Sequence, residues 1–267
     1  MFLARFFSSE GMDLMPDGYL FTFPHFLYIA VSILVIYWML FRVKTNNQNR
    51  NKWIVTVMCI LLLFFKYAGE VIFIYEFYTF SEPVSSFSHS LFDWRTLISF
   101  QMCGINNVLL PFVIWFNVKP MKDFIYTTSV IGGIVVILYP STVLFGDPFT
   151  ITFPMIRSLI VHLILVVLPL YLIRIGDFKL EKKYWYRSLI GSILTALWAL
   201  YGNIFVDPNA NFMFMTKNPF YGGPIPLLNL VPSGWHVILV LLLILIGFII
   251  VYKWFFRIQD KLLKQHI

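Results

Sequence analysis

The sequence predicts an all-α, polytopic membrane protein with seven transmembrane helices in a single integral membrane domain, residues 1–267. Its composition is the first reason: 59% of the residues are hydrophobic and 12% are charged, whereas a soluble domain averages about 45–50% apolar and about 25% charged residues. The second is that apolar runs recur at the length of about 20 residues that a helix needs to cross a bilayer. The third is that basic residues gather in alternate loops.

The seven apolar runs set the expected spans, and two of them have uncertain ends. The fourth contains Gly132, Gly133 and Pro140 and is expected to break early, because proline and glycine interrupt helices. The sixth carries Gly202 and Asn203 near its end and is expected to stop a turn sooner. The expected spans are 24–42, 53–75, 96–117, 123–145, 154–174, 186–206 and 234–256.

The loop charges predict the orientation. Lysine and arginine dominate loops 42–52, 118–122 and 174–187 and the tail from Lys253. Since short cytoplasmic loops carry the basic excess, the N-terminus is expected outside and the C-terminus in the cytoplasm, with the protein in the cell membrane. The net charge of +7 follows from this topology, and we expect no nucleic-acid partner. The intervening loops hold acids with few bases: Glu76, Glu82, Asp93, Asp147 and Asp207.

Two further outer segments are apolar but are not expected to span the membrane. The N-terminal segment 1–23 lacks the basic start and the small-residue cleavage site of a signal peptide, so we expect an interfacial segment that is retained. The outer loop 207–233 is too apolar for a solvated linker. We expect it to fold back over a site or to lie in the membrane interface.

A polar stripe marks the predicted third span. Thr96, Ser99, Cys103, Asn106 and Asn107 follow one another at steps of three and four, which places them on one helical face. Polar groups in hydrocarbon are expensive, so this face should look into the protein or a wet cavity. Cys103 is therefore the candidate nucleophile. The alternative is a buried packing cysteine, because free cysteines are among the most buried residues.

The other cysteine has no polar company. Cys59 lies in a plain apolar run, so the two cysteines give neither a disulfide framework nor a zinc pattern. No pair of residues on one helix has metal-ligand spacing. We expect no metal and no cofactor.

His162 is the candidate base. By the predicted topology it lies in the outer half of the fifth span, roughly 10–13 Å below the start of the helix and at the depth of Cys103. A histidine this deep in a span indicates function. The alternative is a helix-packing histidine bonded to Ser158, one turn earlier.

Other polar residues reach the same level from different helices, whereas the inner halves are almost purely apolar. Arg157 and Glu70 either form an ion pair or bind a lipid phosphate; alternatively, Arg157 anchors at the interface and Glu70 pairs with Lys66. The amides of the polar stripe either donate to an oxyanion or join helices. The same outer level holds His25, Asn106, Asn107 and Asn203.

Three stretches carry a family resemblance: Phe100-Gln-Met-Cys-Gly-Ile-Asn106; Pro154 to His162, followed by Leu168-Pro-Leu-Tyr171; and Asn203 through Asn211-Phe-Met-Phe-Met-Thr-Lys-Asn-Pro219. With them the chain resembles the YwaF-type bacterial membrane proteins, and animal transmembrane protein 164 is a distant relative. His25 and Glu70 fall where that family carries polar residues. Gln101 stands where bacterial members often have a histidine.

The resemblance implies a function, because the animal relative is an acyltransferase that remodels ether phospholipids through a cysteine assisted by a histidine. Carried over, Cys103 bears the acyl group and His162 is its base. A membrane phospholipid is then the expected donor, and a lysolipid or a lipoprotein the acceptor. The expected substrate-binding or oxyanion residues are Asn106, Asn107, Arg157, Gln101, Glu70, His25, Asn203 and Asn211.

Two other classes of function stay open. A transporter would use the same outer polar cluster as half of an access pathway, although it would also need polar groups in the inner halves. A lipid-binding or sensing protein would need no nucleophile.

Overall fold

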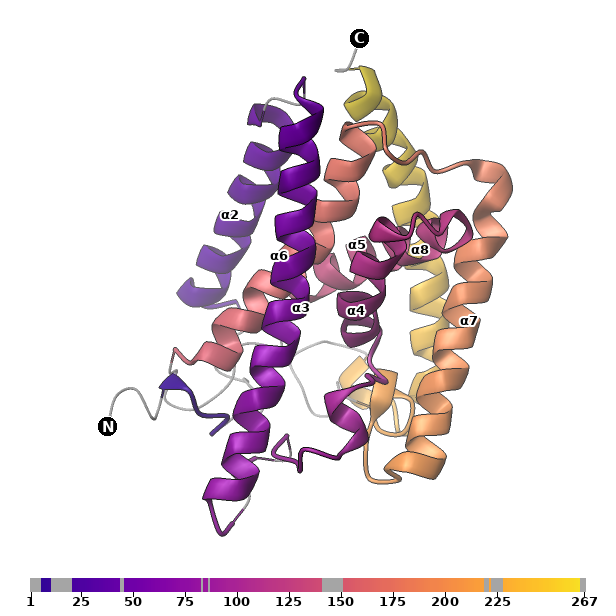
Figure 1. Ribbon diagram of the computed structural model, residues 1–267. Helices are drawn as coiled ribbons and strands as arrows, with labels where there is room; N and C mark the ends of the chain where they lie inside the picture. Colours follow the sequence, from indigo (N-terminus) through magenta and orange to yellow (C-terminus); the bar gives the residue numbers. More distant parts are fainter. Residues whose placement is uncertain are drawn as a thin grey trace.

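The computed structural model describes residues 6–10, 21–43, 46–82, 84–85, 87–140, 151–218, 221 and 228–264, and within these ranges the secondary structure is helical, with no strand. The same ranges contain seven α-helices, which are labelled in Figure 1. They are α2 (Phe23–Tyr37), α3 (Gln48–Thr79), α4 (Met102–Trp115), α5 (Lys119–Leu138), α6 (Phe153–Arg174), α7 (Trp185–Tyr201) and α8 (Trp235–Lys264).

Short turns extend or join these helices. A π-helical turn, η1 (Trp38–Arg42), continues α2, and another, η4 (Gly202–Val206), continues α7. The remaining short helices are of the 3₁₀ type: η2 (Trp94–Thr96), η3 (Lys182–Tyr184), η5 (Phe212–Phe214) and η6 (Leu228–Leu230).

The expectation of an all-helical membrane protein is confirmed at a coarser level than seven spans. Among the described residues, five helices are long and apolar enough to cross a bilayer: Phe23–Arg42, Gln48–Thr79, Lys119–Leu138, Phe153–Arg174 and Lys182–Val206. The count of seven spans, the orientation and the single membrane domain stay predictions. Figure 1 shows the end of α8 at the same end of the bundle as the α2–α3 and α6–α7 connections.

The predicted span 96–117 is not one continuous helix. The turn η2 ends at Thr96, and α4 begins only at Met102. The segment between them is held in a non-helical path, because the Ser99 hydroxyl accepts the backbone N–H of Gln101 at 3.3 Å. The ring of Phe100 is buried among those of Trp94, Trp198 and Phe212. With 14 residues, α4 is about 21 Å long, less than the roughly 30 Å of the hydrocarbon core.

The predicted fourth span 123–145 ends early, as expected. Helix α5 stops at Leu138, because Pro140 disfavours helical geometry at the residue before it. The two glycines of this span do not break the helix, which runs through Gly132 and Gly133. Residues 141–145 of the predicted span lie outside the described residues.

Helices α5 and α6 form the centre of the bundle. Nearly every side chain of α6 from Val161 to Arg174 is buried, and so are residues 122–130 of α5. The surrounding helices expose large apolar side chains instead, for example Ile190, Leu194 and Leu197 on α7. An apolar outer surface around a packed centre is what a lipid environment favours.

Candidate active site

Cys103 is the second residue of α4, not a residue deep inside a helix as the sequence suggested. Gln101 is the N-cap residue and Met102 the first helical residue, so the thiol lies next to the unpaired backbone N–H groups of a helix N-terminus. This end of a helix carries a partial positive charge, which favours a nearby anion. A β-carbon added to Gly132 of α5 would lie 3.1 Å from the Cys103 sulfur, so the thiol packs directly on that glycine.

His162 is held by its own helix in a defined tautomer. Its Nδ1 lies 2.7 Å from the carbonyl oxygen of Ser158 and 3.4 Å from the Ser158 hydroxyl. A carbonyl oxygen only accepts, so Nδ1 carries the proton and Nε2 of the neutral ring has a free lone pair. This is the tautomer that a general base acting through Nε2 requires. The same contact also agrees with the alternative interpretation of His162 as a helix-packing histidine bonded to Ser158.

The pair of glycines in α5 brings the two candidate residues close to the same stretch of helix. A β-carbon at Gly133 would lie 2.6 Å from the carbonyl oxygen of His162 and from Cγ2 of Val166, so α6 packs on Gly133 while the thiol of α4 packs on Gly132. The side chains of Cys103 and His162 form no hydrogen bond with each other. Catalytic hydrogen bonds are often long before a substrate binds. That the side chains of Cys103 and His162 come within direct reach of each other stays a prediction.

Next to Cys103, the amide side chains of α4 leave polar atoms without partners. Asn106 is fully buried, and its Nδ2 donates to Thr128 Oγ1 at 3.2 Å. The Oδ1 atoms of Asn106 and Asn107 have no hydrogen-bond partner among the described residues, and neither does the hydroxyl of buried Ser129 on α5. An unpaired buried polar group costs about 1–3 kcal/mol. Such atoms therefore indicate a place where a ligand or water is needed to complete the site.

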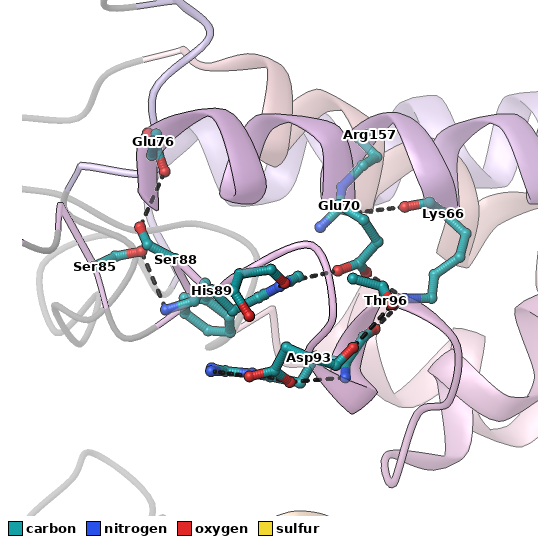
Figure 2. A network of polar contacts seen from close by, with 12 residues as sticks. Lys66, Glu70, Glu76, Ser85, Ser88, His89, Asp93, Thr96 and Arg157 are labelled. Atoms are coloured by element: carbon teal, nitrogen blue, oxygen red, sulfur yellow. Dashed lines mark hydrogen bonds and ion pairs between the residues drawn. The ribbon is translucent and has the colours of Figure 1, made fainter. Parts of the chain in front are cut away.

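A second polar cluster lies on α3 and is fully partnered (Figure 2). We call Lys66, Glu70 and His89 the Glu70 network. The Glu70 carboxylate binds the Lys66 ammonium one turn earlier and lies 3.0 Å from Nε2 of His89. Lys66 also donates to the carbonyl oxygen of Arg95 at 3.4 Å. All three members are buried. One of the two interpretations of Glu70 from the sequence, an ion pair with Lys66, is therefore formed.

The contacts of His89 in this network favour its protonated form. Its Nδ1 faces the carbonyl oxygen of Ser90 at 3.1 Å and its Nε2 faces the Glu70 carboxylate, so both nitrogens must donate. Burial by itself lowers the pKa of His89, but the hydrogen bonds to Glu70 and Ser90 outweigh it, and the pKa of His89 is raised above its ordinary value. Sequence spacing does not link His89 to Glu70, because the two residues are 19 positions apart.

Arg157 contacts the same stretch of α3 without joining the ion pairs. Its Nη1 donates to the carbonyl oxygens of Phe65 and Lys66 at 3.4 and 3.5 Å. A β-carbon at Gly69 would overlap the guanidinium, so the group rests on that glycine. Its Nε is buried and has no partner among the described residues. Arg157 and Glu70 therefore do not form the direct ion pair considered from the sequence.

A neighbouring carboxylate was not identified as a site residue by the sequence. Glu76, which the span prediction placed in a loop, lies in the last turns of α3 and is buried. It accepts from the backbone N–H of Ser9 at 2.7 Å and from the Ser9 hydroxyl, and Ser85 contacts that hydroxyl at 2.7 Å. These partners are far from Glu76 in sequence, so no local pattern signals them.

Three further predicted site residues, Gln101, Asn203 and Asn211, form hydrogen bonds with the loop that follows α7. Gln101 accepts the backbone N–H of Met213 at 3.0 Å, and Asn203 bonds both backbone groups of Phe212. Asn211 bonds residues 216 and 217 of its own loop. The described part of the outer loop thus lies on the segment before Cys103. Met213 has a φ of 53°, an unfavourable backbone geometry that such fixed contacts maintain.

His25 takes a structural position as well. It is fully buried at the start of α2, its Nδ1 accepts the backbone N–H of Phe21 at 3.0 Å, and its Nε2 lies 3.4 Å from the carbonyl oxygen of Ile137. Both ring nitrogens are therefore engaged. Among the described residues, no group of three or more His, Cys, Asp or Glu side chains could hold a metal ion.

An apolar groove of about 690 Å³ runs between α4 and α7 and passes Gly104, the residue after Cys103. One end lies at Ser99 and Trp198, and the other at Arg187. The Arg187 guanidinium lies 3.2 Å from the Asp123 carboxylate. The walls are otherwise almost entirely apolar, which suits a hydrocarbon chain better than a polar solute.

Comparison with known proteins identifies a family for this chain. A model described as the TMEM164 family matches residues 19–260. No curated protein and no solved structure matches.

Proposed function

The chain belongs to the TMEM164 family, and from this premise we propose that it is a membrane-embedded acyltransferase of the cell membrane. It moves a fatty acyl chain from a phospholipid, through a thioester on Cys103, to a lysolipid or a lipoprotein amine. The resemblance to animal transmembrane protein 164 supports the reaction class. The tautomer of His162, fixed at Nδ1 by the Ser158 carbonyl, is the observation that carries the proposal.

In the first half-reaction, Nε2 of His162 takes the proton of the Cys103 thiol. The thiolate attacks the ester carbonyl carbon of the donor, and the C–O bond to the glycerol breaks. The leaving alkoxide takes the proton from His162, so the lysophospholipid departs with a neutral hydroxyl and the acyl group stays on sulfur. The positive end of α4 stabilises the thiolate. Asn106, Asn107 or Arg157 binds the oxyanion or the donor phosphate.

In the second half-reaction, the acceptor hydroxyl or amine gives its proton to His162 and attacks the thioester carbonyl. The C–S bond breaks, and the sulfur regains a proton from His162. Both halves use one site in turn, which suits substrates that diffuse in the bilayer.

The groove between α4 and α7 supports the proposal because it provides room for the acyl chain. It passes Ser99 and Gly104, the residue after Cys103, and continues along α7 to Arg187. From Trp198 to Arg187 that distance along the helix is about 16 Å, close to the half-thickness of a bilayer core of about 30 Å. One acyl chain of one leaflet spans the same depth.

The test is transfer of a radiolabelled acyl chain from a phospholipid to the purified protein. Neutral hydroxylamine should release the label, because it cleaves thioesters far faster than oxygen esters. Cys103→Ala should abolish the label, whereas Cys59→Ala should keep it, since Cys59 is fully buried in the apolar core. Transfer by Cys103→Ala at the wild-type rate contradicts the proposal.

A further inference from the structure

A second groove, distinct from the one beside Cys103, lies between the end of α2, the start of α3 and the middle of α6. Its volume is about 610 Å³. Deeper in, its walls are apolar, for example Val57 of α3 and Leu163 and Val167 of α6. We call it the arginine groove, because its mouth carries Arg42 and Arg50.

The mouth has the composition of a lipid headgroup site. Arg42 and Arg50 come from opposite ends of the short loop between α2 and α3, and both are exposed. Trp38 and Trp53 line the same opening. No aspartate or glutamate among the described residues lines this groove. Tryptophan is enriched where the hydrocarbon meets the headgroups, and basic pockets between transmembrane helices bind anionic headgroups.

The backbone at this mouth is irregular and is fixed by a third arginine. Residues Trp38–Arg42 form the π-helical turn η1, and such turns often occur at functional sites. Arg174, buried at the end of α6, donates to the carbonyl oxygen of Met39 at 2.7 Å. Met39 also lines the groove. Arg174 therefore holds the groove wall in place and adds positive charge behind it.

We propose that the arginine groove binds one anionic membrane phospholipid, with its phosphate between Arg42 and Arg50 and an acyl chain along α3 and α6. The charge of the mouth selects the headgroup, because an arginine guanidinium matches phosphate geometry. The apolar walls take the chain, so a free phosphate gains only part of the binding. This site is independent of the chemistry at Cys103.

The experiment is native mass spectrometry of the purified full chain in detergent, titrated with dioleoylphosphatidylglycerol or dioleoylphosphatidylcholine. The wild type should retain one phosphatidylglycerol in preference to phosphatidylcholine. The double variant Arg42→Gln/Arg50→Gln should weaken that binding by roughly fivefold for each arginine, since a basic residue near a lipid surface contributes about a fivefold factor. Lys179→Gln/Lys182→Gln, which removes two exposed charges outside the groove, should change it less than twofold.

A second arm tests the chain. Val57→Trp fills the groove, whereas Ile60→Trp places the same side chain on an exposed face of the same helix. The first should lower retention of phosphatidylglycerol and the second should leave it unchanged. Equal loss in the two charge variants, no preference over phosphatidylcholine, or binding of glycerol phosphate as strong as that of the lipid would each overturn the proposal.

Discussion

The two buried polar clusters of this protein differ in how their groups are partnered. In the Glu70 network, the carboxylate, the ammonium of Lys66 and the imidazolium of His89 satisfy one another. Beside Cys103, the Oδ1 atoms of Asn106 and Asn107 are buried with no partner among the described residues. A satisfied network stabilises and rigidifies a fold. An unsatisfied one lowers stability and is kept where a ligand completes it.

The difference has a structural cause. The loop between α3 and α4 supplies His89 to the Glu70 network, and the backbone of Arg95 accepts from Lys66. The end of α4 that carries Cys103 packs on the glycines of α5 instead, and among the described residues its amides make a single side-chain hydrogen bond there, from Asn106 Nδ2 to Thr128 Oγ1. We therefore expect the first cluster to contribute stability, whereas the second is the one that the proposed acyl transfer uses.

The largest expected effect is on catalysis. His162→Ala should slow acyl labelling of the protein by about 10²–10⁴-fold, because it removes the general base. His25→Ala is the matched control, since both nitrogens of His25 are engaged in structural contacts. Stopped-time labelling with a radioactive phospholipid measures both. An equal loss in the two variants would show that the effect comes from folding.

The next largest effect is on stability. Glu70→Ala leaves Lys66 and His89 buried without their carboxylate, and removing one partner of a buried pair costs about 3–5 kcal/mol. The unfolding midpoint in detergent should fall strongly, while Glu82→Ala at an exposed position should change the free energy of unfolding by less than about 0.5 kcal/mol. If the two variants unfold alike, the network does not stabilise the fold.

Asn107→Leu should behave in the opposite way. The substitution removes a buried oxygen that has no partner among the described residues and keeps a similar volume, so the free energy of unfolding should stay the same or rise by about 1 kcal/mol. Acyl labelling should fall, since residues of a site are kept for function at the expense of stability. Thermal unfolding and labelling on one preparation separate the two. Marked destabilisation would place Asn107 in the packing of the fold.

The smallest effect is a pH dependence. The pKa of His89 is raised in the folded protein. Its contribution to the free energy of unfolding is therefore complete below its unfolded-state pKa of about 6.5. That contribution is lost as the pH rises through the pKa of His89 in the folded protein. Glu70 and Lys66 from α3, and Asp93 and Arg95 from the following segment, face this group. Above pH 6.5 the unfolding midpoint of the wild type should fall more steeply than that of His89→Gln. If the unfolding midpoints of the wild type and His89→Gln fall in parallel with pH, the raised pKa of His89 is contradicted.

The sequence predicted the helices well, because apolar length and composition are local properties. Its error at residues 96–101 has a tertiary cause. That stretch is apolar enough for a helix, but Phe100 packs on nearby Trp94 and on Trp198 and Phe212 from distant parts of the chain. The stacking moved the start of α4 to Met102, and with it Cys103 to a helix N-terminus.

The candidate site could be predicted only as a set of residues at a common depth. Spacing placed His162 one turn after Ser158, and that contact is formed. Spacing could not show that Asn203 and Gln101 bind the outer loop, because their partners at Phe212 and Met213 have no periodic relation to them. Partners that far apart are determined by packing.

The most direct measurement is the rate at which N-ethylmaleimide alkylates Cys103 in a Cys59→Ala background, with and without His162. It needs no knowledge of the lipid substrate. We predict rapid alkylation that slows strongly in His162→Ala, because the imidazole generates the thiolate that reacts. An alkylation rate that is the same with and without His162, in folded protein, would contradict a catalytic role for the pair.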